Sequence, residues 1–483
     1  MSQLNEKHVL LVHPLGYQAE AATRDISRQA NIMPPLGLAS MAAYLQEAGF
    51  VCRILDCYAY PDADGRLREL LRDFRPFLLG ISCTTASFHD AVRLAQLARS
   101  EAPQIRVVVG GPHVSALQDQ VLEFSPVIDC AVIGEGEQTL LELAQRGGDT
   151  PQPVAGLVWR DGDGTPVNNG YRPTQVVLDD LPFPAYHLLD GFPKAYSLPI
   201  FNYPKTPNTS CLSSRGCPYS CSYCDRSVFK RSFRFNSADY LYRHLEYLKG
   251  RFGIRHINFY DDQFTFHRER VEAFCRLMIE RPLQMTFNCA VRANHVDADL
   301  LKLMKAAGCW MVSLGIESGD AELLAQHRQQ VDLDHLAQTI GTIKQCGIRV
   351  KGLMMMGLPG ESEASIRRSM DYFLSLPVDD MNLAKFTPFP GSPLYAEIHR
   401  HGTFDEDWPK MDCMHFQFIP QGMDKETLET LFIEFYKQHF KRPRILAGYV
   451  AMLWKSPDSW LRFAANAGQF VRFALSNKRY GGG

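Results

Sequence analysis

The sequence predicts two α/β domains in succession, a doubly wound parallel sheet followed by a partial (β/α)6 barrel, and then a helical C-terminal region. Three observations support this. Short β-branched runs alternate with amphipathic stretches over the first 150 residues. The same alternation returns between about residues 206 and 395, after a stretch rich in Gly, Pro and Asp. Beyond residue 396 the pattern is helical, without strand periodicity.

Composition narrows the class of protein. The chain has 483 residues, a formal net charge of −2, 46% apolar residues and 22% charged residues, which are ordinary values for a globular protein. A chain so near neutrality has no basic field, so we expect no nucleic-acid partner. No apolar run reaches the roughly 18 residues of a membrane span, and the N-terminus lacks the layout of a signal peptide. We therefore expect a cytoplasmic protein.

Residues 1–150 are predicted to form the doubly wound sheet. Strands are expected at His8–Pro14, Val51–Cys57, Leu78–Thr84, Arg106–Gly110 and Cys130–Ile133, and helices near Leu36–Ala48, Arg66–Phe74, Phe88–Arg99 and Gln138–Ala144. Such sheets bind ligands at the carboxyl ends of their strands. Glycine and other small residues stand there and let a backbone approach a bulky ligand closely. The candidate binding residues are Pro14, Ser82, Thr84, Gly110, Gly111, Gly134 and Gly136.

The rest of the chain is predicted in three parts. Residues 151–205 read as a linker with a small hairpin, because turn-forming residues are dense there. Residues 206–395 should form the barrel, and residues 396–483 a helical region that ends in a basic amphipathic tail. The barrel strands are expected at Thr209–Ser213, His256–Tyr260, Thr286–Ala290, Met311–Gly315, Arg349–Met355 and Asn382–Phe386.

One tight group of cysteines follows the first barrel strand. Cys217, Cys221 and Cys224 have the spacing C-x3-C-x2-C, while most of the other ten of the 13 cysteines are scattered. Three thiolates on one loop can ligate three irons of a 4Fe–4S cluster and leave the fourth iron open to an amino and a carboxylate group. The alternative is zinc, which favours four ligands in paired C-x2-C groups. Cys211, the candidate fourth ligand, lies inside the predicted strand and is expected to pack in the core.

This spacing, with an aromatic residue directly before the third cysteine, resembles the radical S-adenosylmethionine superfamily. The resemblance implies that Cys217, Cys221 and Cys224 hold a 4Fe–4S cluster. It also implies that S-adenosylmethionine is cleaved reductively to a 5′-deoxyadenosyl radical, with electrons from an external donor of the flavodoxin or ferredoxin type.

Later strand ends resemble those that contact S-adenosylmethionine in that superfamily. The stretch Tyr260-Asp261-Asp262-Gln263-Phe264 resembles its acidic stretch, which implies that Asp261 or Asp262 receives the methionyl amine. A solvated loop is the alternative for this stretch. Arg292 stands at the next strand end and would bind the methionyl carboxylate, with a surface ion pair as a nearly equal alternative.

Three more segments follow in the order that the superfamily shows. Glu317 and Ser318 resemble its ribose-contacting pair. Gly357 belongs to a segment that resembles the glycine motif of the fifth strand, near adenine. Phe386 and Thr387 resemble the end of the sixth strand, whose backbone can face adenine.

The first domain resembles the Rossmann-like domain of cobalamin-dependent radical S-adenosylmethionine enzymes. The likeness rests on the strand ends Ile81–Thr85, Val107–His113 and Gly134–Glu137, and it implies cobalamin as a third cofactor. The signature D-x-H-x-x-G, whose histidine ligates cobalt, is absent, so no axial ligand is assigned. His13 and His113 are expected to be hydrogen-bonded loop histidines. A Rossmann-like domain without a cofactor is the main alternative.

The implied reaction is transfer of a methyl group to an unactivated carbon of an apolar or lipid-like small molecule. The first alternative is an oxidative ring closure, as in the anaerobic magnesium-protoporphyrin ester cyclases, or another radical rearrangement or coupling with the same cofactors. A non-catalytic cobalamin or redox sensor is a minor alternative.

The tail, residues 441–483, is basic and amphipathic. It holds eight Lys or Arg and one acid, Asp458, interleaved with aromatic and aliphatic residues. Such a segment can lie in a membrane interface and would make the protein peripheral at the inner face of the membrane. We narrowly favour a helix that packs on the barrel and keeps its basic face in water.

Overall fold

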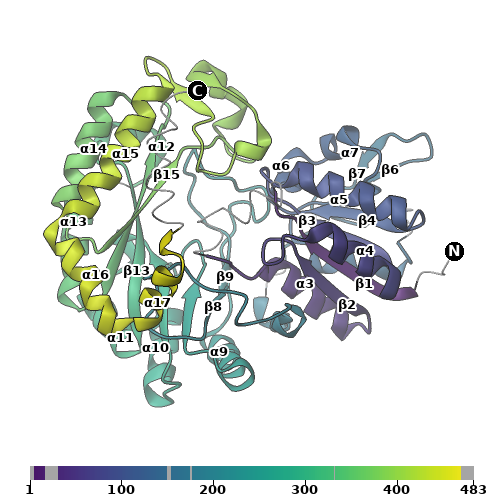
Figure 1. Cartoon of the computed structure of the whole chain (residues 1–483), viewed down its shortest axis with the longest axis horizontal. Helices are drawn as coiled ribbons and strands as arrows, with labels where there is room; N and C mark the ends of the chain where they lie inside the picture. The colour runs from purple at the N-terminus through teal and green to yellow at the C-terminus, as the bar shows by residue number, and fades with distance from the viewer. Residues whose placement is uncertain (1–4, 17–30, 149–153, 175–176, 331, 469–483) are drawn as a thin grey trace.

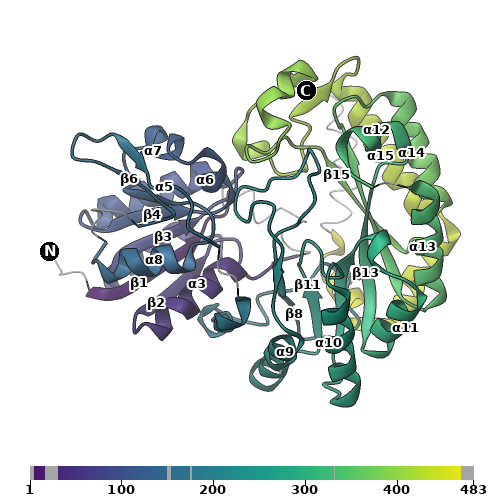
Figure 2. The ribbon, with the colours of Figure 1, turned by 180° about the vertical axis from the view of Figure 1, so that it is seen from behind.

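The computed structural model describes residues 5–16, 31–148, 154–174, 177–330 and 332–468. Two α/β units lie beside each other, and the C-terminal helices of residues 425–455 run along the outside of the second (Figure 1). Figure 2 shows from behind that loops occupy the region between the two units.

The first unit is built on a seven-stranded sheet in the order β2-β1-β3-β4-β5-β6-β7. Strands β1 to β5 are parallel, and β3 is buried almost throughout because helices cover both faces. The strands are β1 (Asn5–His13), β2 (Val51–Asp56), β3 (Pro76–Ser82), β4 (Arg106–Gly110), β5 (Cys130–Val132), β6 (Leu157–Arg160) and β7 (Pro166–Asn168). The helices are α3 (Leu36–Glu47), α4 (Ala63–Asp73), α5 (Phe88–Glu101), α6 (Pro112–Leu117), α7 (Gln120–Phe124) and α8 (Glu137–Gln145).

The doubly wound sheet is confirmed, with two differences. The hairpin expected in the linker, β6 and β7, pairs antiparallel with β5 and so extends this sheet. Pairing satisfies the backbone groups that β5 would otherwise expose at the sheet edge. Helices α6 and α7 were not predicted, because six and five residues are too short to show a helical period.

The second unit is the predicted partial barrel. Its six strands are all parallel and stand in chain order, β8-β11-β12-β13-β14-β15. The strands are β8 (Asn208–Cys211), β11 (His256–Phe259), β12 (Thr286–Val291), β13 (Cys309–Glu317), β14 (Arg349–Met356) and β15 (Asp380–Lys385). The helices are α9 (Ala238–Phe252), α10 (Arg268–Glu280), α11 (Ala298–Ala306), α12 (Ala321–His327), α13 (Leu333–Gln345) and α14 (Glu363–Ser375).

The C-terminal region is helical as predicted, and it also contains one short strand pair that the sequence did not predict. The strands β16 (Gly402–Phe404) and β17 (Phe418–Pro420) pair antiparallel, and at three residues each they are too short for a periodic signal. Three helices follow, α15 (Lys425–Lys441), α16 (Pro443–Lys455) and α17 (Pro457–Ala465). No helix of the described part combines the length and the apolar character that a membrane span requires.

Trp408, between β16 and β17, connects the C-terminal region to the first unit. Its ring centroid lies 4.6 Å from that of His113, 5.7 Å from Phe88 and 5.6 Å from Phe124. Aromatic clusters of this kind stabilise through area and ring geometry together. The C-terminal region therefore contacts the first unit directly, in addition to the covalent connection between the units.

We expect Trp408→Ala to lower the free energy of unfolding by about 1–3 kcal/mol, since it empties this aromatic contact. Urea unfolding of the anaerobic protein, followed by circular dichroism, measures the change. Trp454→Ala is the matched control, because that side chain is 78% exposed, and it should alter stability by less than about 0.5 kcal/mol. Equal effects of the two substitutions would contradict the contact.

Candidate functional site

The cluster loop, residues 212–236, carries the three cysteines, and its two ends are fixed by one arginine. Arg270 of α10 donates to Ser213 O at 3.0 Å and to Asn236 O at 3.2 Å. Asp261 accepts from Ser213 N at 2.6 Å and from Ser214 N at 2.7 Å. Both side chains are buried, and burial leaves such charge-assisted hydrogen bonds strong. The loop therefore starts and ends at fixed points on the barrel.

This geometry corrects the interpretation of Asp261. Both of its oxygens accept from Ser213, one from the backbone N–H and one from the hydroxyl, so they are not free for a methionyl amine. Asp262 remains accessible beside it. Burial raises the pKa of the Cys217 thiol, and the nearby Asp262 carboxylate adds to the shift. Of the two acids, Asp262 is the one that faces the cysteines.

Cys217, Cys221 and Cys224 lie near enough on the cluster loop to shift one another's pKa. A hydrogen bond from Cys224 lowers the pKa of the Cys221 thiol. Cys211 is fully buried, with its Sγ 3.4 Å from His244 Nδ1. Within the described ranges no three His, Cys, Asp or Glu side chains are placed so that they could hold a single metal ion. Three thiols on one loop are the donor set that fits a cluster with an open iron.

Two arginines stand beside the cysteines. The Arg292 guanidinium lies 3.7 Å from the Tyr219 ring centroid. Together with Arg328 it favours the Cys221 thiolate and contributes to its lowered pKa. Arg328 Nη1 lies 3.9 Å from Glu317 Oε1 and donates to Gly315 O at 2.7 Å. Arg328 was missed from the sequence, because it follows α12 in a segment without a motif.

Glu317 and Ser318, which were expected to contact the ribose together, have different environments in the structure. A register shift in β13 occurs at Glu317, whose φ is +67°, and such irregularities re-aim a side chain. Glu317 thereby turns toward Arg328. Ser318, by contrast, is fully buried, with its Oγ 2.8 Å from Ser369 Oγ, and it accepts from Asp320 N. Its hydroxyl serves the packing of α14, so the ribose role expected of Ser318 is not supported.

The residues expected near adenine lie under the cluster loop. Gly357 has φ +94°, and its N–H donates to the buried Glu361 carboxylate. Phe386 is buried in an apolar cluster against which Tyr223 of the cluster loop packs. Thr387 is buried, and its hydroxyl donates to Lys385 O at 3.3 Å. Gly357 and Phe386 thus lie beneath the cluster loop. The Thr387 hydroxyl, in contrast, is already used in its hydrogen bond to Lys385 O.

A histidine missed from the sequence fixes the middle of the cluster loop. His327 Nε2 lies 2.8 Å from Pro359 O, a group that can only accept, so Nε2 carries the proton. His327 Nδ1 must then accept from the Ser222 hydroxyl, 2.8 Å away. Ser222 stands between two of the cysteines, so His327 links the loop to the end of β14.

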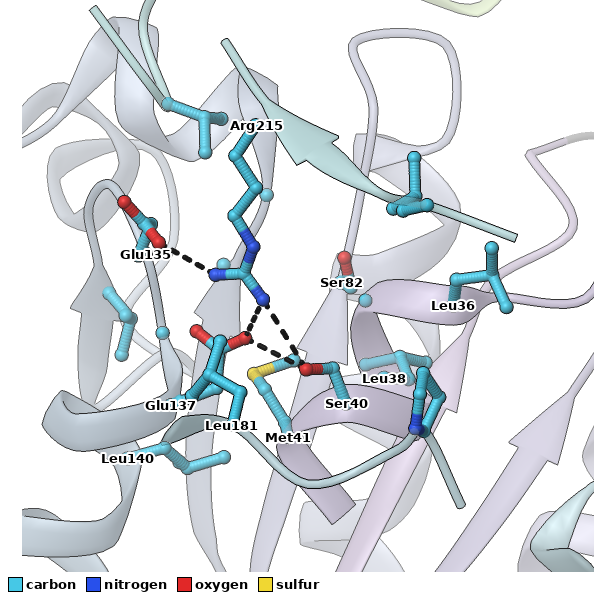
Figure 3. A pocket seen from close by; sticks show the side chains of 18 of the residues that line it. Leu36, Leu38, Ser40, Met41, Ser82, Glu135, Glu137, Leu140, Leu181 and Arg215 are labelled. Atoms are coloured by element: carbon cyan, nitrogen blue, oxygen red, sulfur yellow. Dashed lines mark hydrogen bonds and ion pairs between the residues drawn. The ribbon is translucent and has the colours of Figure 1, made fainter. Parts of the chain in front are cut away.

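A cavity of about 200 Å³ lies between the two units and is lined by both (Figure 3). Of the predicted residues, Ser82, Gly110, Gly111, Gly134 and Gly136 line it. Pro14 and Thr84 are not among its lining residues. Pro14 is buried, and Thr84 is exposed and paired with Ser87.

Glycines let the walls of the cavity pack closely. A Cβ on Gly111 would lie 2.5 Å from Cys83 O, and one on Gly136 would lie 2.9 Å from Met41 Sδ. The remaining wall is largely aliphatic, including Leu36, Leu38 and Leu140. An apolar cavity walled by close-packed backbone fits a flat part of a large cofactor. The loop histidines do not line it, since His13 pairs with Asp56 and His113 with Thr85.

Charged residues missed from the sequence stand at one side of the cavity. Arg215 donates to Glu135 through Nη1 and to Glu137 through Nη2, each at 2.6 Å. Arg234 Nη2 lies 2.5 Å from the other oxygen of Glu135. Figure 3 shows the Arg215 guanidinium between the two carboxylates and Ser40. The alternating Gly-Glu-Gly-Glu sequence at 134–137 is the signal that could have identified these acids.

Comparison with known proteins agrees with this geometry. Residues 26–144 match the B12 binding domain family, and residues 212–373 match the radical SAM superfamily. An uncharacterized methyltransferase, PH0819 of Pyrococcus horikoshii, is 28% identical over 86% of this chain and 89% of its own. The anaerobic magnesium-protoporphyrin IX monomethyl ester cyclase of Rubrivivax gelatinosus is 27% identical (91% and 78%). The hopanoid C-3 methylase of Methylococcus capsulatus is 29% identical (79% and 72%).

Solved structures share the fold. The radical S-adenosylmethionine methyltransferase TsrM of Kitasatospora setae, with cobalamin and a [4Fe-4S] cluster bound, superposes with a TM-score of 0.66 at 20% identity, over 82% of this chain and 75% of TsrM. The cobalamin-dependent radical enzyme OxsB superposes with a TM-score of 0.72 at 18% identity, over 88% and 66%. With its B12 binding domain and its radical SAM domain, this chain is a cobalamin-dependent radical S-adenosylmethionine enzyme that uses a 4Fe–4S cluster, S-adenosylmethionine and cobalamin.

Proposed function

We propose that this enzyme transfers a methyl group to an unactivated carbon of an apolar, lipid-like small molecule. The observation that carries the proposal is the shared wall between the two cofactor regions. Val228 and Phe229, four and five residues after Cys224, line the cavity of the first unit together with Arg215. A cobalamin in that cavity would lie directly beside the cluster loop, where methyl transfer and radical formation can act on one substrate.

The relatives support methylation and an apolar substrate. The names of the Pyrococcus and Methylococcus relatives describe a methyltransferase and a methylase, and the latter acts on a hopanoid, a polycyclic lipid. The alternative, an oxidative ring closure, is favoured by the likeness to the Rubrivivax cyclase. Both reactions begin with reductive cleavage of S-adenosylmethionine, for which a flavodoxin- or ferredoxin-type donor would supply the electron.

We further propose which residues hold S-adenosylmethionine. The cluster supplies the electron and an open iron when bound. Arg292 and Arg328 would attract the methionyl carboxylate, and Asp262 would accept from the methionyl amine. Glu317, turned to this side by the register shift in β13, suits the ribose hydroxyls. Gly357 and Phe386 would lie under adenine.

Finally, we propose peripheral membrane contact through α16 and α17. Arg442 and Arg444 donate to backbone carbonyls of the barrel, so α16 is packed there as the sequence favoured. The outward face of α16 is nevertheless largely apolar, with Arg444 and Lys455 exposed near its two ends. The exposed large hydrophobic side chains on the two helices are Leu446, Val450, Leu453, Trp454 and Leu461. Residues 469–483 of the predicted tail lie outside the described residues.

The reaction is tested by incubating the anaerobic enzyme with reductant, cobalamin, cell extract and methyl-labelled S-adenosylmethionine. We expect label in an extractable apolar product, with S-adenosylhomocysteine and 5′-deoxyadenosine formed together. The triple variant Cys217→Ala, Cys221→Ala, Cys224→Ala should lose the brown chromophore, and its rate of 5′-deoxyadenosine formation should fall at least 100-fold. Cobalamin should still co-purify with this variant. 5′-Deoxyadenosine without methyl transfer would instead favour ring closure.

The two adjacent acids should behave differently. Asp262→Asn removes one charge-assisted hydrogen bond, so the affinity for S-adenosylmethionine should fall roughly tenfold or more with stability unchanged. Asp261→Asn breaks a buried charged network and should cost about 3–5 kcal/mol of stability. Equilibrium dialysis and thermal unfolding measure the two effects. Asp299→Asn, at an exposed acid, is the control. A large stability loss in Asp262→Asn would contradict the assignment.

Membrane contact is tested by sedimentation with vesicles that contain phosphatidylglycerol, at low salt. The wild type should bind, and Trp454→Glu with Leu461→Glu should reduce binding at least fivefold, because charges oppose burial in the interface. Met414→Glu introduces one such charge at an exposed apolar residue outside the two helices and should leave binding intact, and each single variant, Trp454→Glu and Leu461→Glu, is compared with it. If the wild type stays in the supernatant, this part of the proposal is wrong.

A further inference from the structure

The cluster loop is closed by a ribbon that is too short to stand alone. Strands β9 (Ser214–Arg215) and β10 (Arg234–Phe235) have two residues each and pair antiparallel. Their register sets Arg215 opposite Arg234. Like charges directly opposite each other destabilise a strand pair, and a lone two-stranded ribbon is marginal in water. The closure of the loop therefore depends on groups from outside it.

Those groups come from the first unit. Glu135 receives Arg215 on one carboxylate oxygen, at 2.6 Å, and Arg234 on the other, at 2.5 Å. It therefore connects the two strands of the ribbon and cancels their repulsion. Glu137 binds the second nitrogen of Arg215, so two arginines face two carboxylates and the group carries no net charge. All four side chains are at most 15% exposed, and buried charges need such pairing.

The same segment forms the wall of the cavity. Gly134 and Gly136, which flank Glu135, line it together with both glutamates. Further along the loop, the Ser227 hydroxyl donates to Pro112 O at 3.1 Å, directly after the lining residues Gly110 and Gly111. A ligand that presses on this wall therefore contacts the residues that hold the cluster loop closed.

We propose that Arg215 couples the two cofactor sites, so that cobalamin in the cavity and the cluster on the loop each strengthen the binding of the other. Coupling between two sites is reciprocal, so either cofactor can report it. Arg215 acts here as a positioning residue, because it fixes the loop and need not touch a reacting atom. The planar guanidinium of Arg215 binds both glutamates at once, and the single ammonium of a lysine cannot reproduce this geometry. The inference rests on the two cofactors and is independent of methyl transfer.

The test is the affinity of the full-length protein for hydroxocobalamin, measured with the cluster reconstituted and after its removal by a chelator. The wild type should bind about tenfold more tightly with the cluster present, a typical size for coupled sites. Arg215→Gln should bring this ratio close to one, and Arg215→Lys should give an intermediate value. Arg172→Gln removes an ion pair to Glu142 inside the first unit and should keep the wild-type ratio.

A second measurement needs no cluster. Hydroxocobalamin added to the cluster-free wild type should slow amide hydrogen exchange at residues 216–233, and Arg215→Gln should lose that protection. If Arg215→Gln does not fold, the double variant Arg215→Gln, Glu137→Gln keeps neutral hydrogen bonds and replaces it in both experiments. The coupling would be overturned if the wild type bound hydroxocobalamin equally well with and without the cluster. It would also be overturned if the Arg215 variants kept both the wild-type affinity ratio and the wild-type protection from hydrogen exchange. The outcome of the methyl-label experiment would stand in either case.

Discussion

The site depends on one buried interaction, the Arg270–Asp261 network at the base of the cluster loop. The parallel register of β8 and β11 pairs Cys211 with Phe259, and so brings Ser213 beside Asp261, two residues further along each strand. Arg270 then holds both ends of the loop through Ser213 and Asn236. Removing either charge would leave the other buried without its partner, which is costly in a protein interior. The positions of the cysteines follow from this anchoring.

Three further supports act on the loop from different directions. His327 holds its middle through Ser222, Glu135 and Glu137 hold its closing ribbon, and Tyr223 packs on the apolar cluster around Phe386. Side chains supported in this way lose little further freedom when a ligand binds. The cysteines are thereby held at fixed places beside Asp262, Arg292 and Arg328, the residues that we propose bind the methionyl group.

Much of this could be predicted from the sequence, because parallel α/β units give clear periodic signals. All eleven strands expected in the two sheets are present, and the spacing of the cysteines identified the chemistry. Roles of single side chains were harder. Asp261 and Asp262 are identical in type and adjacent, and only the sheet register decides which one turns inward. Ser318, Arg328 and His327 depend on contacts between segments distant in sequence, for which one chain carries no local pattern. The strands β16 and β17 are likewise too short to be seen.

The shared cavity has a consequence for the order of events during synthesis. Domains generally fold in turn as the chain emerges from the ribosome, the N-terminal one first. The seven-stranded sheet is complete once residue 168 has been made. The cavity, however, also needs Arg215, Phe229 and Tyr240, which emerge later. A nascent chain can therefore build the first sheet early, yet the cavity is not enclosed until the first βα unit of the barrel has followed.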